Sequence, residues 1–194
     1  SFVAYLCYIV HAVVVYSLTV STLAKKSPIE FFKGMMPAII FAFSSASSVG
    51  PLPLNMECAQ KLGADKEVTS FVLPLGATIN MDGTAIYQGV CAIFIASCYG
   101  INLTLGQMVT IVLTATLASV GTAGTPGAGM IMLAMVLQSV GLPVEGIALV
   151  AGVDRIFDMG RTGINVVGDL SAAMIISDYE TRREGKEFPK AKGK

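Results

Sequence analysis

The residues with the clearest chemical potential are five polar or charged side chains near the C-terminal end of the sequence. Asp154, Asp158, Arg161, Asn165 and Asp169 follow one another at spacings of four, three, four and four residues. At about 100° per residue, an α-helix gathers all five within an arc of about 80°. Because ionisable groups at membrane depth are costly and rarely face lipid, we expect this stripe to face an interior cavity.

The stripe combines groups that suit an acidic or zwitterionic ligand with oxygen atoms that suit a cation. Arg161 offers a planar fork of donors for a carboxylate, whereas Asp158, one turn earlier, suits an ammonium group. Asp169 lies two turns beyond Arg161 and, with Asn165 and nearby backbone carbonyls, provides hard oxygen ligands for a small cation. The alternative is that Asp158 and Arg161 only neutralise each other inside a helix bundle.

A second polar group interrupts the apolar stretch between residues 67 and 99. Asn80 and Asp82 flank Met81, and Gly83 permits the backbone to unwind there and expose its carbonyl oxygens. Further oxygen atoms in the neighbourhood come from Gly76, Thr78 and Thr84. The same run of residues is also a common turn signal, so a cation site and an ordinary turn both fit it.

The composition places both polar groups in a membrane protein. Of 194 residues, 54% are hydrophobic and only 13% are charged, whereas soluble domains carry about 25% charged residues. Basic residues lie toward the edges of the sequence, and none occurs between Lys66 and Arg155. The sequence begins with Ser1 inside an apolar stretch, so we expect a fragment of a longer protein, with its basic tail in the cytoplasm.

The apolar stretches and their interruptions predict an all-α integral membrane fold. Clusters of Gly, Ser and Pro break two stretches whose two ends have the same charge character, which indicates re-entrant hairpins. One unit, 1–178, is predicted to contain span 1–24, hairpin 28–64, broken span 67–99, hairpin 105–142 and span 144–177, and a basic tail follows at 179–194. Two halves of opposite orientation would form inverted repeats, as in secondary transporters; the alternative is ordinary loops between short helices.

Other functional classes fit the sequence less well. The four cysteines form no CxxC pair, so neither a zinc site nor a disulfide framework is expected. No nucleophile with a base, metal-ligand cluster or phosphate loop is recognisable, so we expect neither an enzyme nor an organic cofactor, and no nucleic-acid partner. An ion channel is the rival within membrane proteins, but a pore has no need for the matched charges of Asp158 and Arg161.

Three stretches, in this order, resemble the glutamate transporter family of sodium:dicarboxylate symporters. They are Asn-Met-Asp-Gly-Thr at 80–84, Gly-Thr-Ala-Gly-Thr-Pro-Gly-Ala-Gly at 121–129, and Asp-Met-Gly-Arg-Thr at 158–162 followed by Asn165 and Asp169. The resemblance covers nearly the whole chain and is greatest to prokaryotic sodium-coupled aspartate and glutamate transporters. It implies part of an elevator-type transport domain, sodium ions co-transported with the substrate, a plasma (inner) membrane location, and a homotrimer formed through a scaffold outside this chain.

The resemblance also implies roles for individual residues. Arg161 would hold the side-chain carboxylate of the substrate and Asp158 its amino group. Remaining substrate contacts and the gate of the second hairpin would come from Asn165, Thr84, Thr162, Ser47, Ser48, Gly124, Pro126 and Gly129. Three sodium sites would consist of Gly76, Asn80, Asn165 and Asp169; of Thr78 with the carbonyls of Ser119, Val120 and Thr122; and of Asn80 with Asp82.

Two residues narrow the implied chemistry, and two others depart from the family pattern. Asp169 favours sodium over proton coupling, and Arg161 favours an acidic over a neutral substrate. A C4-dicarboxylate such as succinate is the alternative substrate, and it would leave Asp158 without an ammonium partner. The family usually supplies an additional arginine, but the corresponding positions here are Ala46 and Met159, which leaves the coupling kinetics open.

Overall fold

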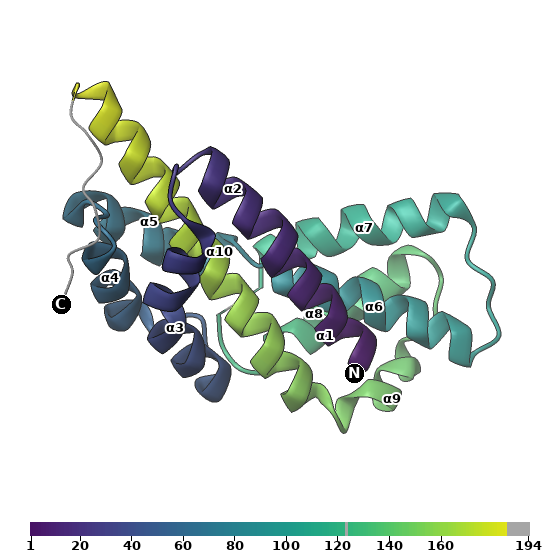
Figure 1. Ribbon diagram of the computed structural model, residues 1–194. Helices are drawn as coiled ribbons and strands as arrows, with labels where there is room; N and C mark the ends of the chain where they lie inside the picture. The colour runs from purple at the N-terminus through teal and green to yellow at the C-terminus, as the bar shows by residue number, and fades with distance from the viewer. Residues whose placement is uncertain (123, 186–194) are drawn as a thin grey trace.

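The computed structural model describes residues 1–122 and 124–185, and these residues form helices and connecting loops, with no strand among them (Figure 1). The first rod consists of α1 (Phe2–Val10), the π-helical segment η1 (His11–Tyr16) and α2 (Ser17–Thr22). Three helix pairs follow: α3 (Pro28–Ser45) with α4 (Leu52–Lys61), α5 (Lys66–Ile79) with α6 (Asp82–Cys98), and α7 (Leu105–Val120) with α8 (Ala128–Ser139). The last elements are the 3₁₀ turn η2 (Val144–Ile147), α9 (Ala148–Ala151) and α10 (Asp154–Arg183).

Each helix pair is interrupted by a short segment of non-helical backbone. Helix α3 ends where Ala46 adopts a left-handed conformation, with φ 52°, and α8 begins after Gly127, with φ 80°. Between α5 and α6 only Asn80 and Met81 are non-helical, and their backbone is not in the right-handed α region. Helix ends leave some backbone groups without a helical partner, and these can bond to neighbouring segments, as the Ser48 N–H does to the Gly124 carbonyl.

Local sequence explains where several helices begin. The Asp65 side chain accepts hydrogen bonds from the backbone N–H groups of Glu67 and Val68, which caps the first turn of α5. Thr104 and Gln107 form a reciprocal capping box at the start of α7. Pro28 occupies the first position of α3, where its missing N–H costs no helical hydrogen bond.

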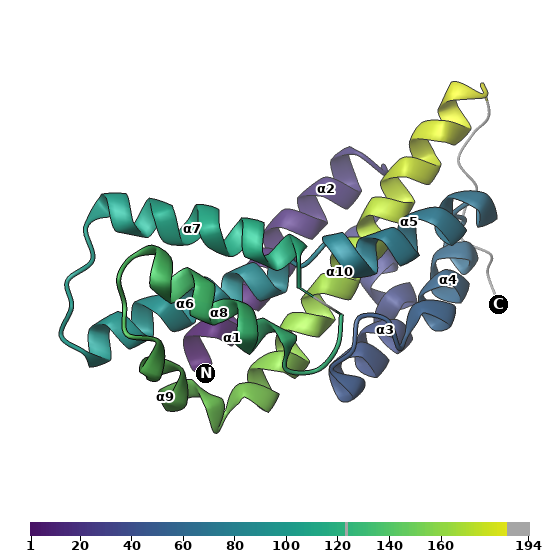
Figure 2. The same ribbon diagram turned by 180° about the vertical axis from the view of Figure 1, so that it is seen from behind.

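Helix α10 forms the centre of the molecule. It packs against α3, α5 and α6, and nearly every residue from Phe157 to Leu170 is buried. In the two opposite views the α3–α4 hairpin lies on one side of α10 and the α7–α8 hairpin on the other (Figures 1 and 2). This arrangement brings the tips of both hairpins toward the first half of α10.

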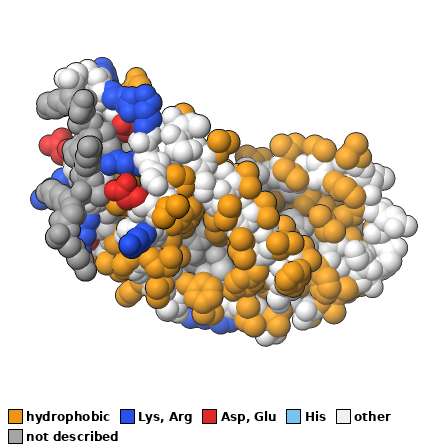
Figure 3. All heavy atoms as spheres, viewed as in Figure 1, with side chains coloured by type: hydrophobic (Ala, Val, Ile, Leu, Met, Phe, Trp, Pro, Cys, Tyr) orange, Lys and Arg blue, Asp and Glu red, His pale blue; other side chains and the backbone are white. Residues whose placement is uncertain are grey.

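Much of the outer surface is apolar. Hydrophobic side chains cover a large part of the face seen in Figure 3, while most charged side chains on that face gather at one end. On the first rod, large apolar side chains such as Phe2, Leu6 and Ile9 are exposed. Two stretches, Phe2–Thr22 and Lys66–Cys98, are long and apolar enough to cross a membrane, judged by length and composition alone.

The C-terminal region differs in detail from the single span predicted for residues 144–177. The 3₁₀ turn and the short helix α9 precede α10, which starts only at Asp154 after non-helical residues at Gly152 and Val153. Helix α10 then continues to Arg183, so the first residues of the predicted tail are helical. The remainder of that tail, 186–194, lies outside the described residues.

Candidate functional site

The centre of the site is an ion pair on α10 that is shielded from solvent. The Arg161 Nε and Nη2 atoms lie 3.0 and 2.9 Å from Asp158 Oδ1, and the two residues are only 2% and 3% exposed. They are three positions apart on one helix, so they share a face as the stripe predicts. Removing one partner from a buried pair leaves an uncompensated charge. Each group therefore requires the other, or a ligand group of opposite charge.

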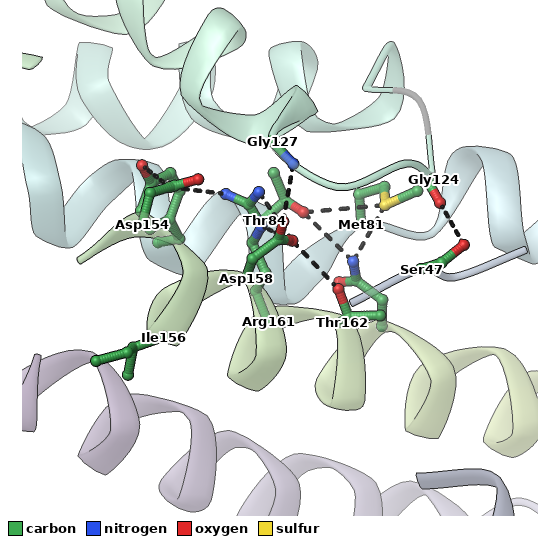
Figure 4. A network of polar contacts seen from close by, with 12 residues as sticks. Ser47, Met81, Thr84, Gly124, Gly127, Asp154, Ile156, Asp158, Arg161 and Thr162 are labelled. Carbon is green, nitrogen blue, oxygen red and sulfur yellow. Dashed lines mark hydrogen bonds and ion pairs between the residues drawn. The ribbon is translucent and has the colours of Figure 1, made fainter. Parts of the chain in front are cut away.

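The Asp158 carboxylate also connects α10 to the second hairpin. Its Oδ2 atom accepts a hydrogen bond from the backbone N–H of Gly127, at 2.8 Å, at the start of α8 (Figure 4). The hydroxyl of Thr162 lies 3.4 Å from Asp158 Oδ1. The group predicted to hold an ammonium is therefore in direct contact with the hairpin predicted to act as a gate.

A glycine in the second hairpin creates the space for the guanidinium. A Cβ atom built at Gly129 would overlap Arg161 Nη1 and would lie 2.6 Å from Arg161 Cζ. No side chain therefore fits at position 129 while Arg161 keeps its place. Nη1 itself is buried and has no hydrogen-bond partner among the described residues, which leaves a strong donor available.

The tips of the two hairpins meet at a single backbone carbonyl. The Gly124 oxygen accepts hydrogen bonds from the Ser48 N–H, at 3.2 Å, and from the Ser47 hydroxyl, at 3.1 Å (Figure 4). A Cβ atom at Gly124 would lie 3.0 Å from the Ala77 carbonyl oxygen, so this tip also approaches the end of α5. The two hairpin tips and the α5–α6 interruption thus come together in space.

A small cavity lies where these segments converge. Its lining comes from both hairpin tips, from the α5–α6 interruption and from α10: Ala46, Ser48, Met81, Thr84, Thr122, Gly124, Thr125, Gly129, Asp158, Arg161, Thr162 and Asn165. Asn165 spans the cavity wall, because its Oδ1 accepts from the Gly83 N–H at 2.9 Å and its Nδ2 lies 3.3 Å from Thr84 Oγ1. Most residues predicted to bind substrate therefore surround one cavity; Pro126 is exposed, and Ser47 contacts the hairpin tip beside it.

Two residues absent from the predicted substrate site hold Arg161 in place. The Tyr87 ring lies under the guanidinium, with Arg161 Cζ 4.6 Å from the ring centroid, and its hydroxyl donates to Asp154 Oδ1 at 2.7 Å. Asp154 Oδ1 is in turn 3.9 Å from Arg161 Nη1. Asp154 belongs to the predicted polar stripe, and Tyr87 lies one helical turn after Thr84. Helical spacing alone could therefore have placed both residues on the faces that line the site.

Beside this cavity, four residues of one predicted sodium site converge. The Asn80 side-chain amide donates to Asp169 Oδ1 at 2.9 Å and to the Asn165 carbonyl at 3.1 Å. A Cβ atom at Gly76 would lie 2.5 Å from Asp169 Oδ1, so only glycine leaves room for this carboxylate. Asp169 is fully buried, and its Oδ2 atom has no hydrogen-bond partner among the described residues. A buried carboxylate with a free oxygen is costly unless a cation or proton accompanies it.

The other predicted sodium ligands have different surroundings. Asp82, two positions after Asn80, accepts from the Gly83 N–H through Oδ1 and contacts η1 through Oδ2.

Thr78 is exposed, and its hydroxyl donates to the Leu75 carbonyl, 2.7 Å away. In the part of the chain that the structure describes, no hydrogen bond joins Thr78 to the segment predicted to complete its site. Within that segment Val120 is exposed, whereas Ser119 and Thr122 are buried and donate to carbonyls of their own helix.

Comparison with known proteins shows the family to which the chain belongs. The model of the sodium:dicarboxylate symporter family matches residues 1–179. The chain belongs to the sodium:dicarboxylate symporter family. Similar proteins include excitatory amino acid transporter 2 of Homo sapiens, 50% identical over 169 residues, which are 87% of this chain and 29% of the relative. An excitatory amino acid transporter of Caenorhabditis elegans is 47% identical over 171 residues, 88% of this chain and 34% of the relative.

Excitatory amino acid transporter 1 of Homo sapiens is 45% identical over 179 residues, 92% of this chain and 33% of the relative. The chain thus spans about a third of the length of the curated relatives it matches. The predicted resemblance to the glutamate transporter family is confirmed, and the relatives named are transporters, not enzymes.

Proposed function

We propose that the longer protein containing this chain is a secondary symporter that moves aspartate or glutamate across a membrane, driven by the sodium gradient. The observation that carries the proposal is the buried pair of Arg161 and Asp158, in contact with the second hairpin at Gly127 and Gly129. An acidic amino acid presents carboxylates and an ammonium, so it can satisfy both charges at once. A simple pore has no need for such a matched pair.

Arg161 is the group best placed to select an acidic side chain. Its Nη1 atom has no hydrogen-bond partner among the described residues, and Gly129 leaves the room that the guanidinium occupies beside the cavity. A guanidinium forms short, charge-assisted hydrogen bonds with a carboxylate, roughly twice as strong as neutral ones. Asp158 is the counterpart for the amino group, while Asn165 and Thr84 offer hydrogen-bonding groups on the far side of the cavity.

Sodium is the second transported substrate in this proposal. Asp169 brings a carboxyl group into the protein interior, where the Asn80 amide donates to Oδ1 and Oδ2 has no hydrogen-bond partner among the described residues. The Asn165 carbonyl oxygen lies beside it, 3.1 Å from the same amide nitrogen. Such hard oxygen ligands suit a small cation, and a bound cation would offset the cost of the buried carboxylate. Thr78 with Ser119, Val120 and Thr122, and Asn80 with Asp82, are proposed as further sodium ligands.

The arrangement of the helices supports a wider architecture for the longer protein. Two interrupted hairpins on opposite sides of α10, with a broken helix between them, suit inverted repeats within an elevator-type transport domain. We include in the proposal a homotrimer formed through segments outside this chain, a plasma (inner) membrane location and a cytoplasmic C-terminal tail. The exposed apolar faces of Figure 3 suit contact with lipid or with those segments.

The decisive experiment measures substrate binding to the full-length protein with and without sodium, and compares aspartate, glutamate and succinate. Aspartate or glutamate binding that requires sodium is expected. Succinate binding as tight as aspartate binding would favour the C4-dicarboxylate alternative, because that ligand gives Asp158 no ammonium partner. Binding of all three without sodium would contradict the proposal.

The variant Arg161→Gln tests the role of the guanidinium directly. Loss of a charge-assisted contact of about 1.5–3 kcal/mol predicts aspartate binding at least about tenfold weaker, with neutral amino acids possible ligands of the variant. Arg183→Gln is the matched control, because Arg183 lies on the same helix but is exposed at its far end. Unchanged aspartate affinity in Arg161→Gln would refute the assignment.

A further inference from the structure

The π-helical segment η1 directs two side chains at one carboxylate. On an α-helix, residues five positions apart point about 140° away from each other, because each residue turns the chain by about 100°. In a π-helix the hydrogen bonds run from i to i+5, so residues five apart return to nearly the same face. His11 and Tyr16, the first and last residues of η1, are five apart and both contact Asp82.

The contacts with Asp82 fix both of its oxygen atoms. His11 Nε2 lies 2.7 Å from Asp82 Oδ2, and the Tyr16 hydroxyl donates to the same oxygen. The other oxygen, Oδ1, accepts from the Gly83 N–H at 2.9 Å. The His11 and Tyr16 rings meet edge to face, with centroids 5.0 Å apart, so each ring restricts the other. The carboxylate orientation is therefore set from η1 on one side and from the start of α6 on the other.

Tyr16 reaches the interruption between α5 and α6 because a glycine on α10 leaves room for it. A Cβ atom at Gly168 would overlap both the Tyr16 hydroxyl and the Asn80 amide nitrogen. Tyr16 is 6% exposed, although most of the first rod is exposed. The tyrosine hydroxyl therefore contacts Asp82 and lies close to Asn80, and these two side chains are proposed as ligands of one sodium ion.

We propose that Tyr16 and His11 are positioning residues that orient the Asp82 carboxylate for cation binding. The inference rests on the sodium coupling proposed above and adds to it a role for η1. Outer donors that hold a ligating carboxylate commonly change metal affinity by about 10- to 100-fold when removed. The competing interpretation is that the same contacts only attach the first rod to α6, which would affect stability but not sodium affinity.

The test uses the full-length protein and the variant Tyr16→Phe, which removes one hydroxyl and keeps the ring. Two quantities are measured: the melting temperature as sodium is titrated without substrate, and the sodium concentration that gives half-maximal aspartate binding. We expect that concentration to rise about tenfold. Tyr5→Phe is the matched control, because Tyr5 lies on the same rod and its hydroxyl donates to a backbone carbonyl, that of Ile156, at 2.6 Å.

The outcomes separate this inference from the proposed function. Sodium titrations of Tyr16→Phe that overlay those of a sodium-dependent parent would overturn the inference and leave the symporter proposal intact. A lower melting temperature with unchanged sodium dependence would also overturn it, because the role would then be structural. A parent with no sodium dependence would overturn both. His11→Gln, which keeps an N–H donor, should resemble the parent more closely than His11→Leu, and the reverse order would contradict the proposed contact.

Discussion

Replacement of Gly129 by alanine isolates the position of the Arg161 guanidinium without removing its charge. The added methyl group would lie 2.6 Å from Arg161 Cζ, whereas nonbonded carbon atoms prefer separations of about 3.5–4.0 Å. The guanidinium must therefore move by about 1 Å or more, since the other atom it overlaps, Nη1, belongs to the same rigid group. Helix α8 itself should tolerate the change, because alanine favours helix over glycine by about 1 kcal/mol.

The expected effect is a loss of affinity for acidic substrate without a loss of folding. A displaced guanidinium loses at least one charge-assisted hydrogen bond, which contributes about 1.5–3 kcal/mol. This loss corresponds to a dissociation constant for aspartate that is roughly 10- to 100-fold larger. Calorimetric titration of aspartate into the full-length protein at saturating sodium measures this constant. The melting temperature of the same sample reports whether folding is intact.

Gly89→Ala provides the matched control for this prediction. Gly89 also lies in a helix, α6, but a Cβ atom there would meet nothing within 4 Å. Aspartate affinity should therefore equal that of the parent. If Gly129→Ala bound aspartate as tightly as Gly89→Ala, the guanidinium would not lie where the substrate carboxylate is held, and the reasoning from the cavity geometry would be wrong.

Two further substitutions test the surroundings of the site. Asp169→Asn replaces the buried carboxyl group beside Asn80 with an amide, which is a weaker cation ligand, so half-maximal aspartate binding should require a higher sodium concentration; sodium titrations that match the parent would count against Asp169 as a cation ligand. Tyr87→Phe keeps the ring under Arg161 but removes the hydroxyl that donates to Asp154, and one lost hydrogen bond to a charged group predicts aspartate binding roughly tenfold weaker. Equal affinity in that variant, measured by the same titration, would show that Asp154 does not act on the guanidinium.

The polar stripe of α10 was predictable because helical periodicity is a local property of the sequence. Spacings of three and four residues placed Asp158, Arg161 and Asn165 on one face, and the structure shows all three lining the same cavity. The proximity of Asn80 to Asp169 followed only from the family resemblance, because 89 residues separate them and no local rule connects such distant positions.

Other features of the site depend on packing that the sequence does not encode locally. Hydrophobic periodicity assumes an α-helix throughout the first rod, so it places His11 and Tyr16 on different faces and misses their shared contact with Asp82. Gly129 was predicted to shape the gate, but its close approach to Arg161 depends on how the second hairpin packs on α10. Likewise, Gly152 alone was too weak a signal to predict that the last span begins with a separate short helix.

The Gly124 carbonyl is the point at which the two hairpin tips are joined by hydrogen bonds. Ser47 and Ser48 both donate to this one oxygen, so displacement of either hairpin breaks the same two hydrogen bonds. Each bond contributes about 0.5–1.5 kcal/mol, so separating the two hairpin tips meets only modest energetic resistance, whichever hairpin moves. In the proposed symporter, substitutions around this one carbonyl should therefore alter inward and outward access to the site together.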